Sequence, residues 1–359
     1  MDANPFVGLI YHWIGGLAAA SFYLPFKRVK GWAWETYWLI AGVFSWILAP
    51  IVLAALLVPD LWSVLSATSG RTLALVYFWG VMWGVGGLTF GLSMRYLGIA
   101  LGYALALGLC TAFGTLVPPL FSGELARVTH DRALQIVVLG VGVCLIGIVF
   151  SGMAGVSKER ELTQEHKREV ISEFNFVKGL IVATFAGVMS ACFAYGLAAG
   201  KPIGDSAAAH LAAGGRSALW QNLPVLVVVL LGGFTTNFIW CVILNARNRT
   251  GHQYARAEGN APLAANYALS ASAGVIWYLQ FFFYSMGQTK MGKYDFSSWT
   301  LHMASIILFS TLWGIMLHEW AGTSRRTRVL VALGIFTLIF STVVVGYGNY
   351  VGAHSAAAH

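Results

Sequence analysis

Three residues in the second half of the chain have the chemistry of a sugar site. Trp277, Gln280 and Tyr284 follow one another at intervals of three and four residues, so a helix would place them on one face. Gln280 can donate and accept hydrogen bonds, and the flanking rings can stack on the apolar face of a sugar. The alternative is a glutamine bonded to a neighbouring helix beside an aromatic belt. Asn237 offers the same amide chemistry and is a second candidate for binding a substrate.

A set of titratable residues further along suggests proton transfer. Asp295, Ser298 and His302 are spaced to share one helical face, and two of them can exchange protons. If they face inward, they could sense a proton gradient. The alternative places Asp295 at a solvent edge as a helix cap. His12, near the start of the chain, is a further candidate for proton coupling, with simple helix packing as its alternative.

Glu35 stands immediately before an apolar run, close to Lys27 and Arg28. Its carboxylate either pairs with one of these two basic residues or faces a cavity, where it could load a proton. Arg95 and Lys201 follow other apolar runs and are typical of interfacial anchors. Lys201, next to a proline at a helix end, could also act in gating.

The elements that must position these side chains follow from the composition. Of the 359 residues, 58% are hydrophobic and 10% are charged, whereas about 25% of a soluble domain is charged. Too few charges remain to cover a water-facing surface. The 22 Phe, 14 Tyr and 14 Trp residues also exclude a disordered chain. The remaining solvent is a lipid bilayer.

Ten apolar runs are long enough to cross a bilayer as helices, which needs about 20 residues each. They carry no Asp, Glu or Arg and do not alternate in polarity as membrane β-strands would. The predicted fold is therefore all-α and integral to the membrane. The runs are Val7–Phe26, Thr36–Val58, Leu73–Met94, Leu97–Leu120, Ala133–Val156, Val177–Gly200, Ala218–Leu244, Pro262–Gly287, Phe296–Leu317 and Val329–Val351.

The basic residues predict the orientation of these helices. Alternate loops, beginning with the one after the first run, contain 14 of the 22 Lys and Arg residues, and Lys178 at the edge of the sixth run brings this side to 15. Positive charge in short loops marks the cytoplasmic side. We therefore expect both termini on the periplasmic side. The longest charged loop, residues 157–176, is expected in the cytoplasm as a solvated helical linker.

Short internal similarities predict that the two halves of the chain are related. Gly8–Phe22 resembles Gly179–Phe193, and Gly80–Trp83 resembles Gly274–Trp277. Each half has five predicted helices, an odd number, so the two copies must cross the membrane in opposite directions. Such inverted repeats are the architecture of many secondary transporters. The predicted divisions are residues 1–156 and 177–352 for the two repeats, 157–176 for the linker and 353–359 for a tail.

Other classes of function find no support in the pattern. The sequence has no cluster with metal-ligand spacing, no nucleophile motif and no carboxylate pair in a solvent-facing cleft. We therefore expect neither an enzyme nor a metal site, and no cofactor apart from protons as the coupling ion. A nucleic-acid partner would need a basic, water-facing surface, which such a chain lacks. No obligate protein partner is evident.

Several motifs resemble one known family. The segments HWIGGLAAASFYLPFKRVKGWAWETYW, MWGVGGLTFGLSMRYLG, WYLQFFFYSMG and YDFSSWTLHM are similar to those of the bacterial L-rhamnose–proton symporters, within the drug/metabolite transporter superfamily. The resemblance covers about Gly8 to Tyr350. The motif positions are His12, Tyr23, Lys27, Trp34, Glu35, Trp83, Arg95, Trp277, Gln280, Tyr284, Asp295, Trp299 and His302.

The resemblance implies ten helices in two inverted halves in a bacterial cytoplasmic membrane, and uptake of L-rhamnose with a proton. It adds Tyr23, Trp83 and Trp299 to the candidate substrate-binding residues, and it places Lys27 and Arg95 in gating or charge pairing. Asn245–Ala261 and Ala353–His359 depart from the family pattern, and we expect neither to touch the motif residues. The lipid bilayer and a small sugar are the expected partners.

Two alternatives remain open from the sequence. The chain could import another deoxy sugar or a pentose, or export a metabolite, as other members of the superfamily do. In a different class, it could be a membrane sensor or scaffold that moves no substrate.

Overall fold

The structure is a computed structural model that describes residues 3–97, 99–161, 176–256, 262–318 and 320–355. Every regular element in these ranges is helical, as the apolar runs predict. The first half contains α1 (Pro5–Ser21), α2 (Tyr23–Phe26), α3 (Trp34–Val43), the π-helical turn η1 (Phe44–Leu48), α4 (Ala49–Leu57), α5 (Leu61–Ala67), α6 (Gly70–Leu97), α7 (Ile99–Phe121), the 3-10 turn η2 (Glu124–Arg127) and α8 (Arg132–Glu161). The second half contains α10 (Phe176–Ala199), α11 (Lys201–Ala213), η3 (Ala218–Trp220), α12 (Leu223–Asn248), η4 (Thr250–Tyr254), α13 (Leu263–Gln288), η5 (Gly292–Ser297), α14 (Ser298–Met316) and α15 (Arg325–Ser355).

Nine helical segments of the described chain are long and apolar enough to cross a membrane. They coincide with nine of the ten predicted runs. The remaining run corresponds to α13, which has 26 residues but is less apolar because it includes polar side chains such as Asn266, Ser270 and Gln280. The protein is therefore an all-helical, multi-pass membrane protein.

The charged segment after the fifth span begins as a helix. Residues Ser157–Glu161, the first part of the predicted helical linker, continue α8. They are held there because Glu161 accepts hydrogen bonds from the amide and the hydroxyl of Ser324, at 2.8 and 2.6 Å, at the start of α15. The rest of the predicted linker, residues 162–175, lies outside the described part of the chain.

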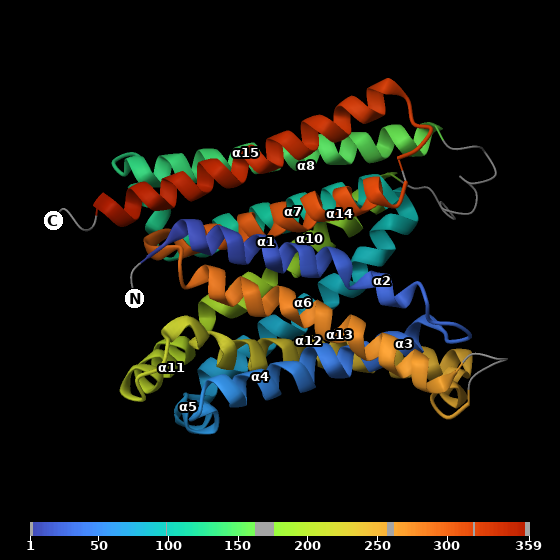
Figure 1. Cartoon of the computed structure of the whole chain (residues 1–359), viewed down its shortest axis with the longest axis horizontal. Coiled ribbons are helices and arrows are strands. Elements are labelled where there is room, and N and C mark those ends of the chain that lie inside the picture. The colour runs from blue at the N-terminus through green and yellow to red at the C-terminus, as the bar shows by residue number, and fades with distance from the viewer. Residues whose placement is uncertain (1–2, 98, 162–175, 257–261, 319, 356–359) are drawn as a thin grey trace. The chain divides into compact units, whose positions relative to one another are not determined.

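The chain divides into two compact units, each built from several segments. The first comprises Met1–Leu17, Gly86–Ala194 and Met286–His359, and the second comprises Ala18–Val85 and Tyr195–Ser285. In the first unit, α8 and α15 lie side by side (Figure 1). Glycine allows this approach: a methyl group on Gly140 would lie 2.9 Å from the backbone nitrogen of Val345.

In the second unit, α12 packs against α3, η1 and α4. It also meets α6 at a crossing where a methyl group on Gly80 would lie 2.0 Å from the carbonyl oxygen of Val229. Small residues at a helix crossing let the two backbones approach closely, which is how membrane helices gain packing contacts. This crossing positions Trp83, which lies one turn further along α6.

A charged contact stabilises one end of the first unit. Asp131 accepts hydrogen bonds from the Tyr294 hydroxyl, from Lys293 Nζ at 2.9 Å and from the Leu134 amide at 3.1 Å. Partial burial disfavours the charged carboxylate, but these three donors outweigh that effect and lower the pKa of Asp131 to about 2.

We predict that Tyr294→Phe raises the pKa of Asp131 and destabilises the protein by about 1 kcal/mol at pH 7. The native pKa lies below the ordinary value of 3.8, so this stabilisation is present above pH 4. It is lost as the pH falls toward 2. Thermal unfolding in detergent, measured from pH 7 to pH 3, should show a difference between the variant and the parent that shrinks with falling pH. A difference independent of pH would contradict the prediction.

Candidate functional site

The second unit contains a closed ring of aromatic side chains. Going round it, the ring centroids of successive residues are 4.3 to 6.3 Å apart. In order, the members are Phe22, Trp277, Phe281, Trp83, Trp46 and Trp38. They come from the residue between α1 and α2 and from α3, η1, α6 and α13, so segments far apart in the sequence supply one aromatic wall.

A small pocket lies against this wall. Its lining includes Phe22, Trp38, Trp46 and Trp277 from the ring, and its volume is about 10 Å³. Such a cavity has room for about one water molecule. The pocket is therefore closed to a monosaccharide in this conformation.

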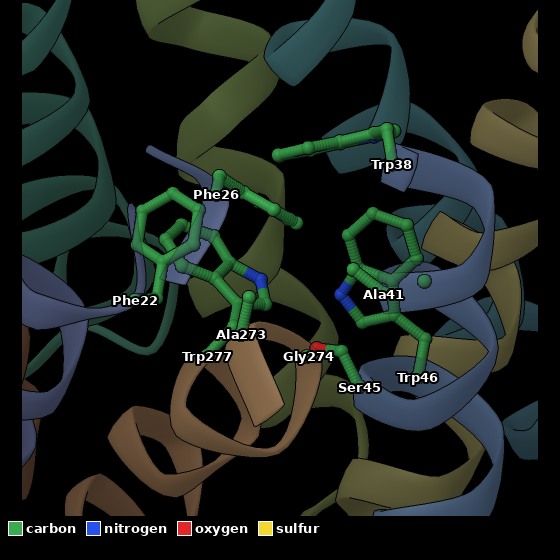
Figure 2. A pocket seen from close by; sticks show the side chains of 10 residues that line it. Phe22, Phe26, Trp38, Ala41, Ser45, Trp46, Ala273, Gly274 and Trp277 are labelled. Carbon is green, nitrogen blue, oxygen red and sulfur yellow. The ribbon is translucent and has the colours of Figure 1, made fainter. Parts of the chain in front are cut away.

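Three hydrogen-bond donors are buried at this pocket. In the described part of the structure, the Ser45 hydroxyl and the indole nitrogens of Trp46 and Trp277 have no hydrogen-bond partner. Figure 2 shows the two indole nitrogens turned toward the same space, with the Ser45 oxygen beside it. A buried polar group without a partner costs about 1–3 kcal/mol, so three of them in one pocket indicate a place for a polar ligand.

The π-helical turn η1 explains why Ser45 and Trp46 point into the pocket. Pro50 follows this turn, and a proline cannot donate the usual hydrogen bond to the carbonyl four residues earlier. The backbone widens instead, and the Ala49 amide bonds to the Phe44 carbonyl five residues back. π-Turns within helices often lie at functional sites. Neither Ser45 nor Trp46 was predicted, and the proline within the second apolar run was the available signal.

Close packing between α3 and α13 forms one side of the pocket. A methyl group on Gly274 would lie 2.2 Å from the carbonyl oxygen of Ala41, and both residues line the cavity. We predict that Gly274→Val separates these helices, destabilises the protein by about 2 kcal/mol and removes ligand binding. Thermal unfolding and ligand titration would measure both effects. Gly87→Val on α6, where a methyl group would contact nothing within 4 Å, is the control that should leave both unchanged.

Glu35 is the buried acid of the second unit. Its side chain is 4% exposed at the start of α3, and its Oε1 accepts hydrogen bonds from Asn248 Nδ2 at 3.0 Å and from the Thr250 hydroxyl at 2.9 Å. These donors are neutral, where the sequence suggested Lys27 or Arg28. A carboxyl group bonded to neutral donors can change its protonation state without breaking an ion pair.

The segment around Asn248 corrects one prediction. Asn245–Ala261 was expected not to touch the motif residues, but it supplies both donors to Glu35. Arg249 has a left-handed φ of 57°, which ends α12 and turns the chain back toward α3. Gln253 then accepts hydrogen bonds from the Ala33 amide at 2.7 Å and the Thr36 hydroxyl at 2.8 Å. Residues 257–261 of this segment lie outside the described ranges.

The other predicted substrate residues of the second unit lie around the ring. Asn237 accepts a hydrogen bond at 3.1 Å from the indole nitrogen of Trp38 and thereby holds that ring in place. Trp83 packs behind Trp46. Gln280 and Tyr284 are buried on α13 but are not among the residues that line the pocket. Tyr23 is 46% exposed and packs edge-on against Phe22.

The first unit contains the remaining predicted residues. His12 and His302 are both buried, and a methyl group on Gly287 would lie 2.8 Å from the His12 ring. Trp299 is also buried, and its indole nitrogen donates to the Cys110 carbonyl at 3.1 Å. This Trp299 donor is therefore engaged within the protein in this conformation.

Asp295 and His302 differ in exposure, and their common helical face stays a prediction. Asp295 is exposed in the 3-10 turn η5, whereas Ser298 and His302 are buried in α14. Tyr294 has non-helical dihedral angles (φ −110°, ψ 47°), so the chain is kinked one residue before Asp295. The residue at the N-cap position of α14 is Ser297, two residues after Asp295.

The predicted gating residues differ in their surroundings. Lys201 is exposed and pairs with Asp205 at 3.1 Å, one turn along α11. Such surface pairs contribute little to stability. Lys27 is exposed after α2. Arg95 lies in α6, but its side chain is outside the described part of the structure.

The fold and the site define a class, namely multi-pass helical membrane proteins with an internal aromatic pocket. A model of the L-rhamnose-proton symport protein (RhaT) family matches residues 1–351. Proteins named L-rhamnose-proton symporter in Klebsiella pneumoniae, Cronobacter sakazakii and Shigella flexneri are each 38% identical to the chain over 344 residues, or 95% of this chain and 97% of each relative. The chain belongs to the L-rhamnose-proton symport protein family, which confirms the resemblance seen in its motifs. The family is one of transport proteins, in agreement with the prediction that the chain is not an enzyme.

Proposed function

We propose that this protein is a proton-coupled symporter that imports L-rhamnose by alternating access. The observation that carries the proposal is the set of three unpartnered donors at the aromatic pocket. L-Rhamnose is a 6-deoxy sugar whose methyl group and apolar ring face suit stacking on Trp and Phe. Its hydroxyl groups can accept hydrogen bonds from Ser45, Trp46 and Trp277. The closed pocket fits a cycle in which α3 and α13 separate to admit the sugar.

Glu35 is the proton carrier in this proposal, because two helices join it to the sugar pocket. On α3, Glu35 precedes Trp38 by one turn, and α12 bonds to both residues through Asn248 and Asn237. An ionised carboxylate accepts from both of its donors, whereas a protonated one has lost part of that capacity. Protonation at Glu35 therefore loosens the contact between α3 and α12 beside the pocket.

The remaining candidates have secondary roles in the proposal. His12 and His302, buried in the first unit, form the relay for protons. Asp295 is the alternative carrier, although its exposure makes it the weaker candidate. Gln280, Tyr284 and Trp83 do not line the closed pocket, and they contact the sugar after the pocket opens. Tyr23, Lys27, Arg95, Lys201 and Trp299 act in gating or in shaping the cavity.

The proposed architecture is ten membrane helices in two inverted five-helix repeats, residues 1–156 and 177–352, as in the drug/metabolite transporter superfamily. One observation supports the repeat. The boundaries between the compact units fall within α1, α6, α10 and α13, which are the helices paired by the internal similarity. We place the protein in the bacterial inner membrane, with both termini in the periplasm, because of the charge distribution among the loops.

Uptake into proteoliposomes tests the proposal. With one proton per sugar, an inward gradient of one pH unit should drive roughly tenfold accumulation of labelled L-rhamnose. Equal accumulation after the gradient is collapsed would exclude symport. A panel of L-fucose, a pentose and D-glucose as competitors then tests the substrate, and failure of unlabelled L-rhamnose to compete best would reassign it. Absence of any net sugar flux would favour a sensor or scaffold.

A further inference from the structure

A groove in the first unit is separate from the aromatic pocket. It has a volume of about 420 Å³, within the range of ligand sites of about 300–1,000 Å³. Residues of α7, α8 and α15 line it: Ala104, Leu105, Val149, Gly152, Met153, Val156, Ser157, Arg160, Arg326 and Leu330. Most of this lining is apolar. Val149 and Met153 are 57% and 44% exposed, so the groove opens at the lipid-facing side of α8.

The two charged residues in this lining are both arginines. Arg160 is in the last turn of α8 and Arg326 is in the first turn of α15, so they lie at one end of the groove. Ser157 also lines this end, where its hydroxyl donates to Glu161 Oε1 at 3.5 Å and accepts from Thr327 Oγ1 at 2.7 Å.

The length of the apolar part corresponds to one leaflet of a bilayer. From Val149 to Arg160, α8 rises roughly 16 Å, about half of the ~30 Å hydrocarbon core. The basic end is also typical of a membrane interface, where tryptophan and basic side chains are common. There, Lys158 Nζ lies 4.8 Å from the centroid of the Trp320 ring. The positive-inside rule places this end on the cytoplasmic side, where anionic lipids attract basic residues.

We propose that this groove binds one anionic phospholipid of the inner leaflet. The guanidinium groups of Arg160 and Arg326 hold its phosphate, and an acyl chain lies along Val149, Met153 and Leu330. A guanidinium group matches phosphate oxygens in a bidentate manner. The apolar groove below the arginines selects a lipid over free phosphate, because only a lipid fills both parts of the site.

Native mass spectrometry of the purified full chain tests the proposal. After delipidation, the protein is incubated with phosphatidylglycerol, with phosphatidylethanolamine or with inorganic phosphate. We expect one phosphatidylglycerol to be retained in preference to phosphatidylethanolamine, and we expect inorganic phosphate not to displace it. The double substitution Arg160→Gln with Arg326→Gln should lower retention of phosphatidylglycerol roughly tenfold or more.

The control removes the same charge from the same end of the molecule. Arg325→Gln with Arg328→Gln changes two exposed arginines of α15 that do not line the groove, and this variant should retain the lipid as the parent does. Equal losses in the two double variants would overturn the proposal in favour of general surface attraction. Displacement by inorganic phosphate would also overturn it.

A second variant tests the apolar half without changing the charge. Val149→Trp places an indole in the groove from an exposed position on α8, and it should also reduce lipid retention roughly tenfold. If the arginine variant does not fold, lipid retention by the Val149→Trp variant tests the proposal instead. Unchanged retention in Val149→Trp would show that no acyl chain occupies the groove.

Discussion

Glu35→Gln is expected to abolish uphill accumulation of L-rhamnose while leaving sugar binding and sugar exchange intact. Glutamine keeps the size of the side chain and can still bond to Asn248 and Thr250, but it cannot take up a proton. The accumulation ratio in proteoliposomes should therefore fall from roughly tenfold per pH unit to one. Exchange of labelled for unlabelled sugar, which needs no net proton movement, should continue.

Two further substitutions make this result specific. Asp295→Asn removes the other candidate acid, and Asp205→Asn removes an exposed acid that pairs with Lys201 on the surface. We expect Asp205→Asn to behave as the parent protein does. Loss of accumulation in Asp295→Asn with full accumulation in Glu35→Gln would transfer the role of carrier to Asp295. Loss of exchange in Glu35→Gln would show instead that the carboxyl group is needed for sugar movement itself.

Trp46→Phe and Trp277→Phe should each weaken L-rhamnose binding roughly tenfold without destabilising the protein. Each change removes an indole N–H but keeps an aromatic ring in the wall of the pocket. In the unliganded protein these N–H groups have no partner within the described structure, so their removal relieves a desolvation cost. If these N–H groups serve to bind the sugar, each variant should therefore have an unchanged or higher Tm and a higher Kd for L-rhamnose than the parent. Sugar titration and thermal unfolding on the same preparations measure the two quantities.

Trp32→Phe is the matched control for the two pocket variants. Trp32 is also a buried tryptophan of the second unit whose indole nitrogen lacks a partner in the described structure, but it does not line the pocket. It should leave the Kd for the sugar unchanged. If Trp32→Phe weakens binding as much as Trp46→Phe, or if neither pocket variant weakens it, the aromatic pocket is not the sugar site.

Much of the fold could be predicted because the bilayer imposes a strong local rule. Each span must be a continuous apolar helix of about 20 residues, so a single run such as Val177–Gly200 reveals one element without knowledge of its neighbours. Nine of the ten runs correspond to such helices in the structure. Helix ends were less predictable, since the end of α8 depends on hydrogen bonds between Glu161 and Ser324.

The candidate site was only partly predictable. Trp277 was selected for its type and spacing, and it does line the pocket. Gln280 and Tyr284 were predicted on the same helical face as Trp277, but they do not line the pocket. The pocket lies where α13 approaches α3 at Gly274, further toward the start of α13. Ser45 enters the pocket through a π-turn, a backbone change that a regular helical period cannot represent.

The sequence by itself determined the membrane class and the family of this protein, because hydropathy and motifs are read along one continuous chain. Only the tertiary structure decided which side chains meet. Glu35 finds its donors 213 and 215 residues later in the chain, in a segment that the motifs had left aside. The Trp38 indole is likewise held by Asn237, 199 residues away. Such contacts follow from the packing of helices against one another, and no pattern within a single helix specifies them.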